Sequence, residues 1–237
     1  MSSNEESRTN LTTNGWDDYF WKSGQKDPPF HVQEVHSTVK KFYNQLFSEG
    51  KTGRIFIPLC GKSLDLIYFA DLGHDVFGLE FSEVAVESFF AENNLKFTKY
   101  DLENEPFVVY KCLDKAITLY RGDFFKFKPE ICGQFDAFWD RGSFIAINMG
   151  QRLEYAEIMF KLMKNTSKYL LQGAYYDGTK YAGPPHYLSE DSLRETLGKR
   201  YSYELLETKE STPPIPNLKM DWTINIYLLE PKVKGSL

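Results

Sequence analysis

The sequence predicts an α/β fold in which a mainly parallel sheet of seven strands carries helices on both faces. Short apolar runs alternate with segments of helical period along most of the chain, which is the pattern of repeated β-α units. The first apolar run ends in a glycine turn, and the next run ends in a carboxylate about twenty residues later. No helical segment separates the last two runs, so the final strand must return antiparallel to its neighbour.

The helices are predicted from apolar residues that recur at three- and four-residue steps. Two of them begin at serine N-caps, Ser82 and Ser189, each followed by acidic residues that suit the first turn of a helix. Val84 and Leu153 are expected on the buried sides of their helices. In chain order, the predicted helices cover residues 31–47, 63–72, 82–94, 152–164 and 188–198.

The strands are predicted from short runs rich in β-branched and aromatic residues. A hairpin turns at residues 113–115, and the glycine-proline-proline turn at residues 183–185 is expected to be a rigid loop. The predicted strands cover residues 54–58, 76–80, 117–120, 134–140, 168–176, 203–208 and 223–230. A parallel sheet with one antiparallel strand near its C-terminal edge is the outline of the Rossmann-like class I methyltransferase fold.

Length and composition indicate one ordered domain. The chain has 237 residues, of which 42% are hydrophobic and 16% aromatic, and no shift in composition divides it. We expect residues 1–14, which are polar, to form a disordered tail. Residues 15–237 are expected to form a single domain, in which residues 15–50 supply a lid segment and a helix, and we expect the protein to be a monomer.

Charge and cysteine content limit the partners and the location. The net charge is −5 and no basic cluster is present, so the chain lacks the electrostatic footprint of a nucleic-acid-binding protein. Cys60, Cys112 and Cys132 are too scattered for a disulfide framework or a zinc site, which suits a reducing compartment. No apolar signal segment and no run of about 18 apolar residues occurs. The sequence therefore predicts a cytoplasmic protein that binds no membrane, nucleic acid or metal.

The turn in RIFIPLCGKS, residues 54–63, distinguishes three kinds of ligand site. A phosphate loop needs a glycine five positions before Gly61, where Phe56 stands. A dinucleotide site needs three glycines in its turn, and only Gly61 is present. S-adenosylmethionine carries no phosphate, so a closely approaching turn at Leu59 to Gly61 and an acid for the ribose hydroxyls, Glu80, are sufficient. The pattern favours S-adenosylmethionine.

Longer motifs carry a family resemblance. They are Trp21-Lys22-Ser23-Gly24 before Phe30-His31, PLCGK at residues 58–62, FADLGHDVFGLEFSE at residues 69–83, FDAFWDRGSFIAIN at residues 135–148, and the glycine-proline-proline turn with Tyr187. With these motifs the chain resembles the thiopurine S-methyltransferase family from residue 16 to the last strand. The resemblance implies S-adenosyl-L-methionine as methyl donor, S-adenosyl-L-homocysteine as product and a small-molecule thiol as acceptor.

The resemblance also implies which residues bind these molecules. Asp123 follows a strand at the ligand end of the sheet, where it can read the adenine amino group, and Arg141 can pair with the cofactor carboxylate. Trp21 and Phe30 precede the first predicted helix and can cover the site, with the acceptor pocket near Phe30. The implied cofactor-binding residues are Trp21, Leu59, Gly61, Glu80, Asp123, Phe124 and Arg141.

The acceptor is less well defined than the cofactor. His186 and residues 210–221, in which Lys219 is the only cation, depart from the family pattern near the acceptor. Methyl transfer to a thiolate is an in-line displacement that needs no protein nucleophile. Thiols with a pKa below about 8.5 supply thiolate near neutral pH, so a general base is optional, and Asp27, His31 and Asp140 are the candidates. The aromatic content favours aromatic or heterocyclic thiols.

Two other functions remain open at this point. The same fold can methylate a different small acceptor, such as a selenium or halide compound or another thiol. A catalytically silent relative would bind S-adenosylmethionine as a sensor or scaffold without turnover. A panel of acceptors distinguishes these possibilities.

Overall fold

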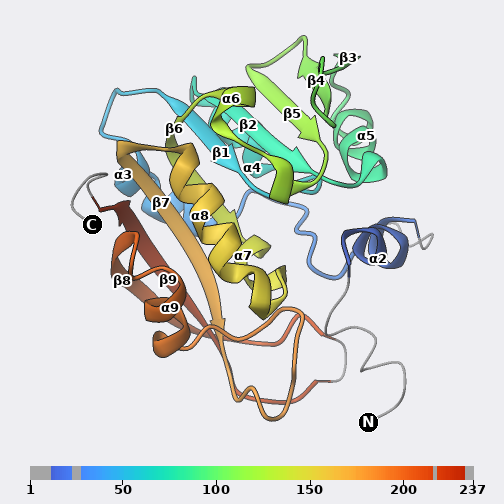
Figure 1. Cartoon of the computed structure of the whole chain (residues 1–237). Coiled ribbons are helices and arrows are strands. Elements are labelled where there is room, and N and C mark those ends of the chain that lie inside the picture. The colour runs from blue at the N-terminus through green and yellow to red at the C-terminus, as the bar shows by residue number, and fades with distance from the viewer. Residues whose placement is uncertain (1–11, 23–27, 216–217, 233–237) are drawn as a thin grey trace.

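The computed structural model describes residues 12–22, 28–215 and 218–232, and in this part of the chain a nine-stranded sheet forms the centre of the molecule (Figure 1). The strand order is β3-β4-β5-β2-β1-β6-β7-β9-β8. The strands are β1 (Arg54–Ile57), β2 (Asp75–Glu80), β3 (Phe97–Asp101), β4 (Val108–Cys112), β5 (Ile117–Arg121), β6 (Phe135–Arg141), β7 (Met163–Tyr175), β8 (Tyr201–Ser211) and β9 (Trp222–Pro231).

Helices connect most of the strands. Ser82 and Ser189 cap two of them as the sequence predicts, since the Ser82 hydroxyl accepts from the Ala85 amide at 3.3 Å and Ser189 from Ser192 at 3.1 Å. The helices are α2 (Thr13–Trp16), α3 (Ser37–Leu46), α4 (Asp65–Asp71), α5 (Glu83–Glu92), α6 (Pro129–Cys132), α7 (Ser143–Ala146), α8 (Arg152–Leu162) and α9 (Glu190–Thr196), with the short turns η1 (Asp17–Trp21), η2 (Phe124–Lys126) and η3 (Met149–Gln151).

The direction of the strands creates a ligand-binding edge. Strands β5, β2, β1, β6 and β7 are parallel, whereas β9 runs antiparallel between β7 and β8. The chain order reverses between β1 and β6, so the carboxyl ends of these two strands flank a topological switch point, where open α/β sheets bind ligands.

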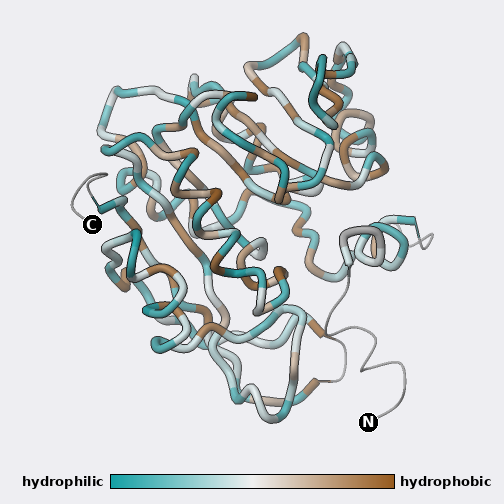
Figure 2. Tube along the Cα trace, in the orientation of Figure 1, coloured by the Kyte–Doolittle hydropathy of each residue, from teal (hydrophilic) through white to brown (hydrophobic). Residues whose placement is uncertain are grey.

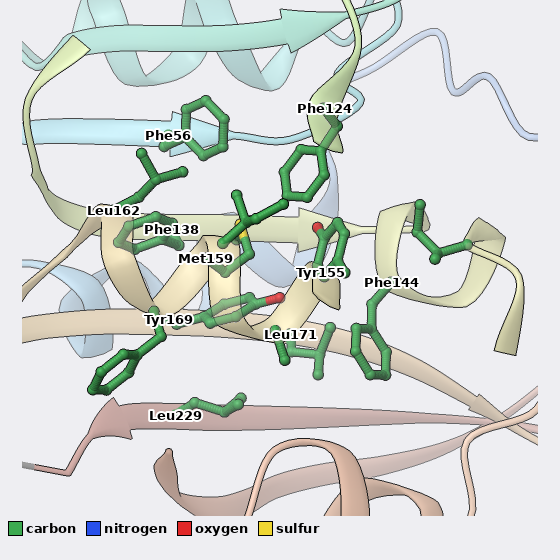
Figure 3. Close-up of a cluster of buried hydrophobic side chains, with 14 of the residues drawn as sticks. Phe56, Phe124, Phe138, Phe144, Tyr155, Met159, Leu162, Tyr169, Leu171 and Leu229 are labelled. Atoms are coloured by element: carbon green, nitrogen blue, oxygen red, sulfur yellow. The ribbon is translucent and has the colours of Figure 1, made fainter. Parts of the chain in front are cut away.

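Each face of the sheet has its own hydrophobic core. Helices α3, α4 and α5 pack on one face, and Val39, Leu66 and Phe89 are completely buried there. Helices α7, α8 and α9 pack on the other face, where Phe124 lies beside Tyr155 of α8 (Figure 3). Hydrophobic segments run through the central strands, and hydrophilic ones lie around the edge of the molecule (Figure 2). The cores hold the central strands, and with them the switch point, in place.

The predicted fold class is confirmed, and the sheet is wider than predicted. The seven predicted strands are present, and β3 and β4 add a hairpin antiparallel to β5. The hairpin predicted to turn at residues 113–115 is present as β4 and β5, which pair antiparallel. Strand β3 was not predicted, because its side chains are mostly exposed and show no apolar alternation.

Several details of the helices differ from the prediction. The helix expected over residues 31–47 begins at Ser37, where the His36 side chain accepts from the Thr38 amide and acts as its N-cap. Val84 and Leu153 were expected to be buried but are 41% and 56% exposed. In each helix the buried side chains lie on another side, because neighbouring residues are rotated by about 100° around the axis.

The N-terminal tail was expected over residues 1–14. Residues 1–11 lie outside the described residues, and Thr13 and Asn14 belong to α2. The helix expected over residues 152–164 ends at Leu162, and Met163 is the first residue of β7. In the described part of the chain, no helix is long and apolar enough to span a membrane.

Candidate functional site

A cavity of about 1360 Å³ opens at the switch point. Its lining includes the residues that follow β1, β2, β5 and β6, together with η1 and the loop before α3. All eight residues that the family resemblance implies for cofactor or acceptor binding line this one cavity: Trp21, Phe30, Leu59, Gly61, Glu80, Asp123, Phe124 and Arg141.

The turn after β1 brings the backbone to the cavity wall. Leu59 and Gly61 have positive φ angles of 42° and 52°, which is uncommon for a leucine and ordinary for a glycine. The turn is tied to β2 by a hydrogen bond of 3.0 Å from the Cys60 amide to the Leu79 carbonyl. A Cβ on Gly61 would lie 3.2 Å from the Trp21 ring, so the glycine allows the indole to pack on the turn.

Glu80 ends β2 and its carboxylate holds the turn. Its Oε2 accepts from the Gly61 amide at 2.8 Å, and its Oε1 accepts from the amides of Phe81 and Ser82, both at 2.8 Å. Burial raises the pKa of Glu80, and these three backbone donors oppose the shift. Three of about four acceptor positions on the carboxylate are thus occupied, which leaves room for a donor from a ligand.

The segment before α3 covers the cavity with aromatic rings. Phe30 packs against Trp16, Phe20 and Trp21, with ring centroids 5.1 to 6.1 Å apart. Asp17, in η1, is 7% exposed and lines the cavity. Its Oδ2 pairs with the Lys22 Nζ at 2.8 Å, whereas its buried Oδ1 has no hydrogen-bond partner in the described residues.

The loop after β5 adds a third wall. Asp123 caps η2, since its carboxylate accepts from the Phe125 amide at 3.0 Å. Phe124 is buried, and its ring stacks on that of Tyr155 with centroids 4.4 Å apart. The stacking fixes the position of this loop relative to α8.

Arg141 ends β6 among buried polar groups. Asp65 accepts from the His36 amide at 2.8 Å and from the Trp139 indole at 2.7 Å. Burial lowers the pKa of Arg141 and that of His36, the latter to about 4, and the charge of Arg141 contributes to the shift of His36. His36 is therefore neutral at pH 7, and its Nδ1 accepts from the Thr38 amide at 3.3 Å, so Nε2 carries the proton.

The loop that contains the two prolines forms another wall, and side chains bind its carbonyl groups. The Tyr176 hydroxyl donates to the Pro185 carbonyl at 2.6 Å, and the Tyr181 hydroxyl to that of Pro184. Arg152, 1% exposed, donates to the carbonyls of His186 at 3.3 Å and of Tyr187 at 3.0 Å. The loop is held in a defined shape, as its sequence predicts.

The two candidates for a general base that the structure describes, His31 and Asp140, have different surroundings. Asp140 is completely buried, and its carboxylate accepts from the hydroxyls of Tyr155 and Tyr169 at 2.6 and 2.7 Å and from two backbone amides. It does not line the cavity, so its assignment as a base is wrong and its role is structural. His31 lines the cavity, and Asp27 lies outside the described residues.

Lys62 does not serve as a phosphate-binding lysine. It is 3% exposed, and its Nζ contacts both carboxylate oxygens of Glu92 at 2.7 and 2.9 Å. In the described residues no group of three or more His, Cys, Asp and Glu side chains can hold a metal ion.

Sequence reasoning missed three polar groups of the cavity: Asp17, His36 and Gln172. Gln172 stands in a strand of otherwise apolar residues, Tyr169 to Ala174, and this was the one signal available. Nothing in the local sequence marked Asp17 or His36.

The model of the Thiopurine S-methyltransferase family matches residues 11–226. The chain belongs to this family. Thiopurine S-methyltransferase from Rattus norvegicus is 38% identical over 199 residues, which are 83% of this chain and 81% of the rat protein. The probable thiopurine S-methyltransferase of Danio rerio is 35% identical over 189 residues, 79% of this chain and 81% of the fish protein.

Solved structures of other methyltransferases share the fold of this family member. Magnesium protoporphyrin IX methyltransferase from Synechocystis superposes with a TM-score of 0.59 at 14% identity, covering 92% of this chain and 99% of the other. The 1,6-didemethyltoxoflavin-N1-methyltransferase of Burkholderia thailandensis gives a TM-score of 0.59 at 12% identity, with 98% and 92% covered. At this identity the likeness establishes the class I methyltransferase fold.

Proposed function

We propose that this protein is an S-adenosylmethionine-dependent S-methyltransferase that acts on aromatic or heterocyclic small-molecule thiols. The observation that carries the proposal is the cavity at the switch point, around which Leu59, Gly61, Glu80 and Arg141 converge. Membership of the thiopurine S-methyltransferase family supports the reaction type.

The residues around the turn fit the cofactor. The Leu59 to Gly61 turn allows close approach, and Glu80 retains an acceptor position for a ribose hydroxyl. The Oδ1 of Asp17, which has no partner among the residues that the structure describes, is a second buried acceptor of the same cavity, and the hydroxyl and ammonium groups of S-adenosylmethionine are donors. Asp123 with Phe124 is assigned to the adenine, Trp21 to the cover over the turn, and Arg141 to the carboxylate.

When bound, S-adenosylmethionine supplies an electrophilic methyl group on a sulfonium sulfur. The protein orients the acceptor sulfur in line with this methyl group and excludes water from the pair. The aromatic rings of Trp16, Phe20 and Phe30 can close over the cavity, and Phe30 is assigned to the acceptor. No residue has to form a covalent bond to the substrate.

Titration with S-adenosylhomocysteine tests the cofactor site. Glu80→Gln preserves the shape of the side chain and one oxygen but replaces an acceptor with a donor next to backbone amides. We expect its affinity for S-adenosylhomocysteine to fall by about tenfold or more, since hydrogen bonds to charged groups contribute about 1.5–3 kcal/mol. Isothermal titration calorimetry measures this change.

The control for that variant is Glu157→Gln, because Glu157 and its partner Arg200 both lie outside the cavity lining, and this variant should bind with wild-type affinity. Equal affinity of Glu80→Gln and wild type, or no binding by the folded wild type, would contradict the cofactor site. Transfer of a labelled methyl group to thiophenol then tests the activity, and binding without transfer to any thiol would favour a silent relative.

We further propose that the protein works in the cytoplasm as a monomer that requires no metal. Cys60, Cys112 and Cys132 are all free and buried, which supports a reducing compartment. The net charge of −5 supports a small-molecule partner rather than a nucleic acid. Light scattering of the purified protein, and activity after dialysis against a chelator, test the monomer and the absence of a metal requirement.

A further inference from the structure

A row of side chains crosses four strands at the floor of the cavity. Arg141 of β6 is paired with Gln172 of β7, Gln172 with Ile226 of β9, and Ile226 with Glu207 of β8. All four line the cavity. Residues paired directly across neighbouring strands point to the same face of a sheet, with strands about 4.8 Å apart. The Gln172 side chain therefore lies next to that of Arg141.

Gln172 is the member of this row with a buried side-chain polar atom that no described residue pairs with. It is 9% exposed, and its buried Oε1 has no hydrogen-bond partner in the described part of the chain. Its neighbour Ile226 is apolar, and the carboxylate of Glu207 pairs with the Lys41 Nζ at 2.7 Å. A buried amide oxygen without a donor costs free energy, so its presence at a cavity wall indicates that a ligand supplies the donor.

Resting on the proposed function, we infer that Gln172 selects acceptors whose ring carries an N–H next to the reacting sulfur, such as the thione form of a heterocyclic thiol. The Oε1 of Gln172 accepts the hydrogen bond from this ring N–H. A carbocyclic thiol, such as thiophenol, has no N–H to offer, so it gains nothing from the carboxamide. Gln172 is thus a specificity-determining residue of the acceptor site.

The electron balance of the reaction explains why this contact favours turnover. A lone pair of the thione sulfur forms the new S–CH₃ bond, and the old bond to the sulfonium breaks with its electron pair moving to the cofactor sulfur. The positive charge passes to the ring, mainly onto the N–H group, whose proton then leaves to water. A hydrogen bond from this N–H to Gln172 strengthens as the charge develops, so it stabilises the transition state more than the bound substrate.

The test compares two acceptors with rings of equal size, pyridine-2-thione and thiophenol. In Gln172→Met, which keeps the length of the side chain, we expect the ratio of kcat/KM for pyridine-2-thione over thiophenol to fall by about tenfold or more. Part of the loss should appear in kcat for pyridine-2-thione, because the contact strengthens in the transition state. The affinity for S-adenosylhomocysteine should stay within about twofold of wild type.

Gln134→Met is the matched control. The Gln134 amide, remote from the cavity, donates to the carbonyls of Lys161 and Met163 at 3.1 and 2.8 Å. Gln134→Met should keep the acceptor ratio and lower the melting temperature. Gln172→Met should melt at or above the wild-type temperature, because replacing an unpaired buried amide by an apolar group removes a desolvation cost.

Three results would overturn the inference: an unchanged acceptor ratio in Gln172→Met, a loss of affinity for S-adenosylhomocysteine in this variant, or a lower melting temperature like that of Gln134→Met. The second would assign Gln172 to the cofactor and the third to the structure. If the wild type methylates thiophenol, and Gln172→Met methylates pyridine-2-thione as well as the wild type does, this inference alone is contradicted. A wild type that methylates neither acceptor contradicts the proposed function itself.

Discussion

His36 combines a structural and an electrostatic role at one residue. Its imidazole caps α3 and lies 5.7 Å from the Trp139 ring, within the lining of the cavity. Burial, together with the charges of Arg141 and Lys209, lowers its pKa to about 4, although Asp65 and Glu34 oppose the shift. The residue therefore stays neutral at physiological pH, and it adds no charge beside Arg141 where an anionic group is expected to bind.

This shift predicts a loss of stability in acid. The pKa is about 4 in the folded protein and 6.5 in the unfolded chain, so the unfolded chain binds more protons between these values. The contribution of His36 is fully present above pH 6.5 and is lost as the pH falls to 4, by up to about 3 kcal/mol. His36→Asn keeps a capping side chain and should reduce this loss. Urea denaturation at pH 7 and pH 4.5 measures it, and identical losses in both proteins would contradict the shift.

At the level of elements, α8 and the loop after β7 are joined by Arg152. The two prolines in the loop have no backbone N–H, so the loop offers few backbone donors of its own. Its carbonyl groups therefore accept hydrogen bonds from side chains. Arg152 reaches from α8 to the carbonyls of His186 and Tyr187, and its guanidinium lies 4.9 Å from the Phe144 ring. We regard Arg152 as a positioning residue, since it touches the wall of the cavity from behind and does not line it.

Arg152→Lys should therefore weaken acceptor binding more than cofactor binding. A lysine cannot reproduce the planar fork, and an unsatisfied buried carbonyl costs about 1–3 kcal/mol. We expect a lower melting temperature and an increase of about five- to tenfold in KM for the thiol, with the affinity for S-adenosylhomocysteine nearly unchanged. Arg194→Lys, at an exposed ion pair with Asp191, is the matched control and should behave as wild type. A parallel loss of cofactor affinity would show that Arg152 supports the whole site.

At the scale of the whole molecule, one continuous sheet links both ends of the cavity. Of the proposed cofactor residues, Gly61 follows β1, Glu80 ends β2 and Asp123 follows β5, whereas Gln172 and Ile226 belong to β7 and β9 on the other side of the switch point. The two cores on opposite faces share the same strands, so local loosening on one side affects the other. We expect the chain to unfold in a single cooperative transition.

Ligand binding should raise the temperature of that transition. At S-adenosylhomocysteine concentrations of about 100 times the dissociation constant, binding stabilises the folded state by about 2.7 kcal/mol. For a domain of this size the melting temperature should rise by about 5–10 °C. Scanning calorimetry with and without ligand checks both statements. Two separate transitions, of which only one responds to the ligand, would contradict a single cooperative domain.

Local patterns in the chain were sufficient for the fold and for much of the cavity. The alternation of strands and helices requires a mainly parallel sheet, and the missing helix between β8 and β9 requires an antiparallel return. A glycine after β1 and a carboxylate at the end of β2 identified Gly61 and Glu80, because both act through backbone geometry close to their own positions.

Other features depended on which distant segments meet. Asp140 reads as a possible base in the sequence, but Tyr155 and Tyr169 enclose it only once α8 packs on the sheet. The role proposed for Gln172 requires a position beside Arg141, and the pairing register of β6 and β7 determines that position. The sequence by itself determined the order and direction of the strands and the turn at the switch point, because these follow from local periodicity and chain connections. Tertiary structure alone decided which buried polar groups are satisfied and which still need a partner, because hydrogen bonding between remote side chains depends on packing and register.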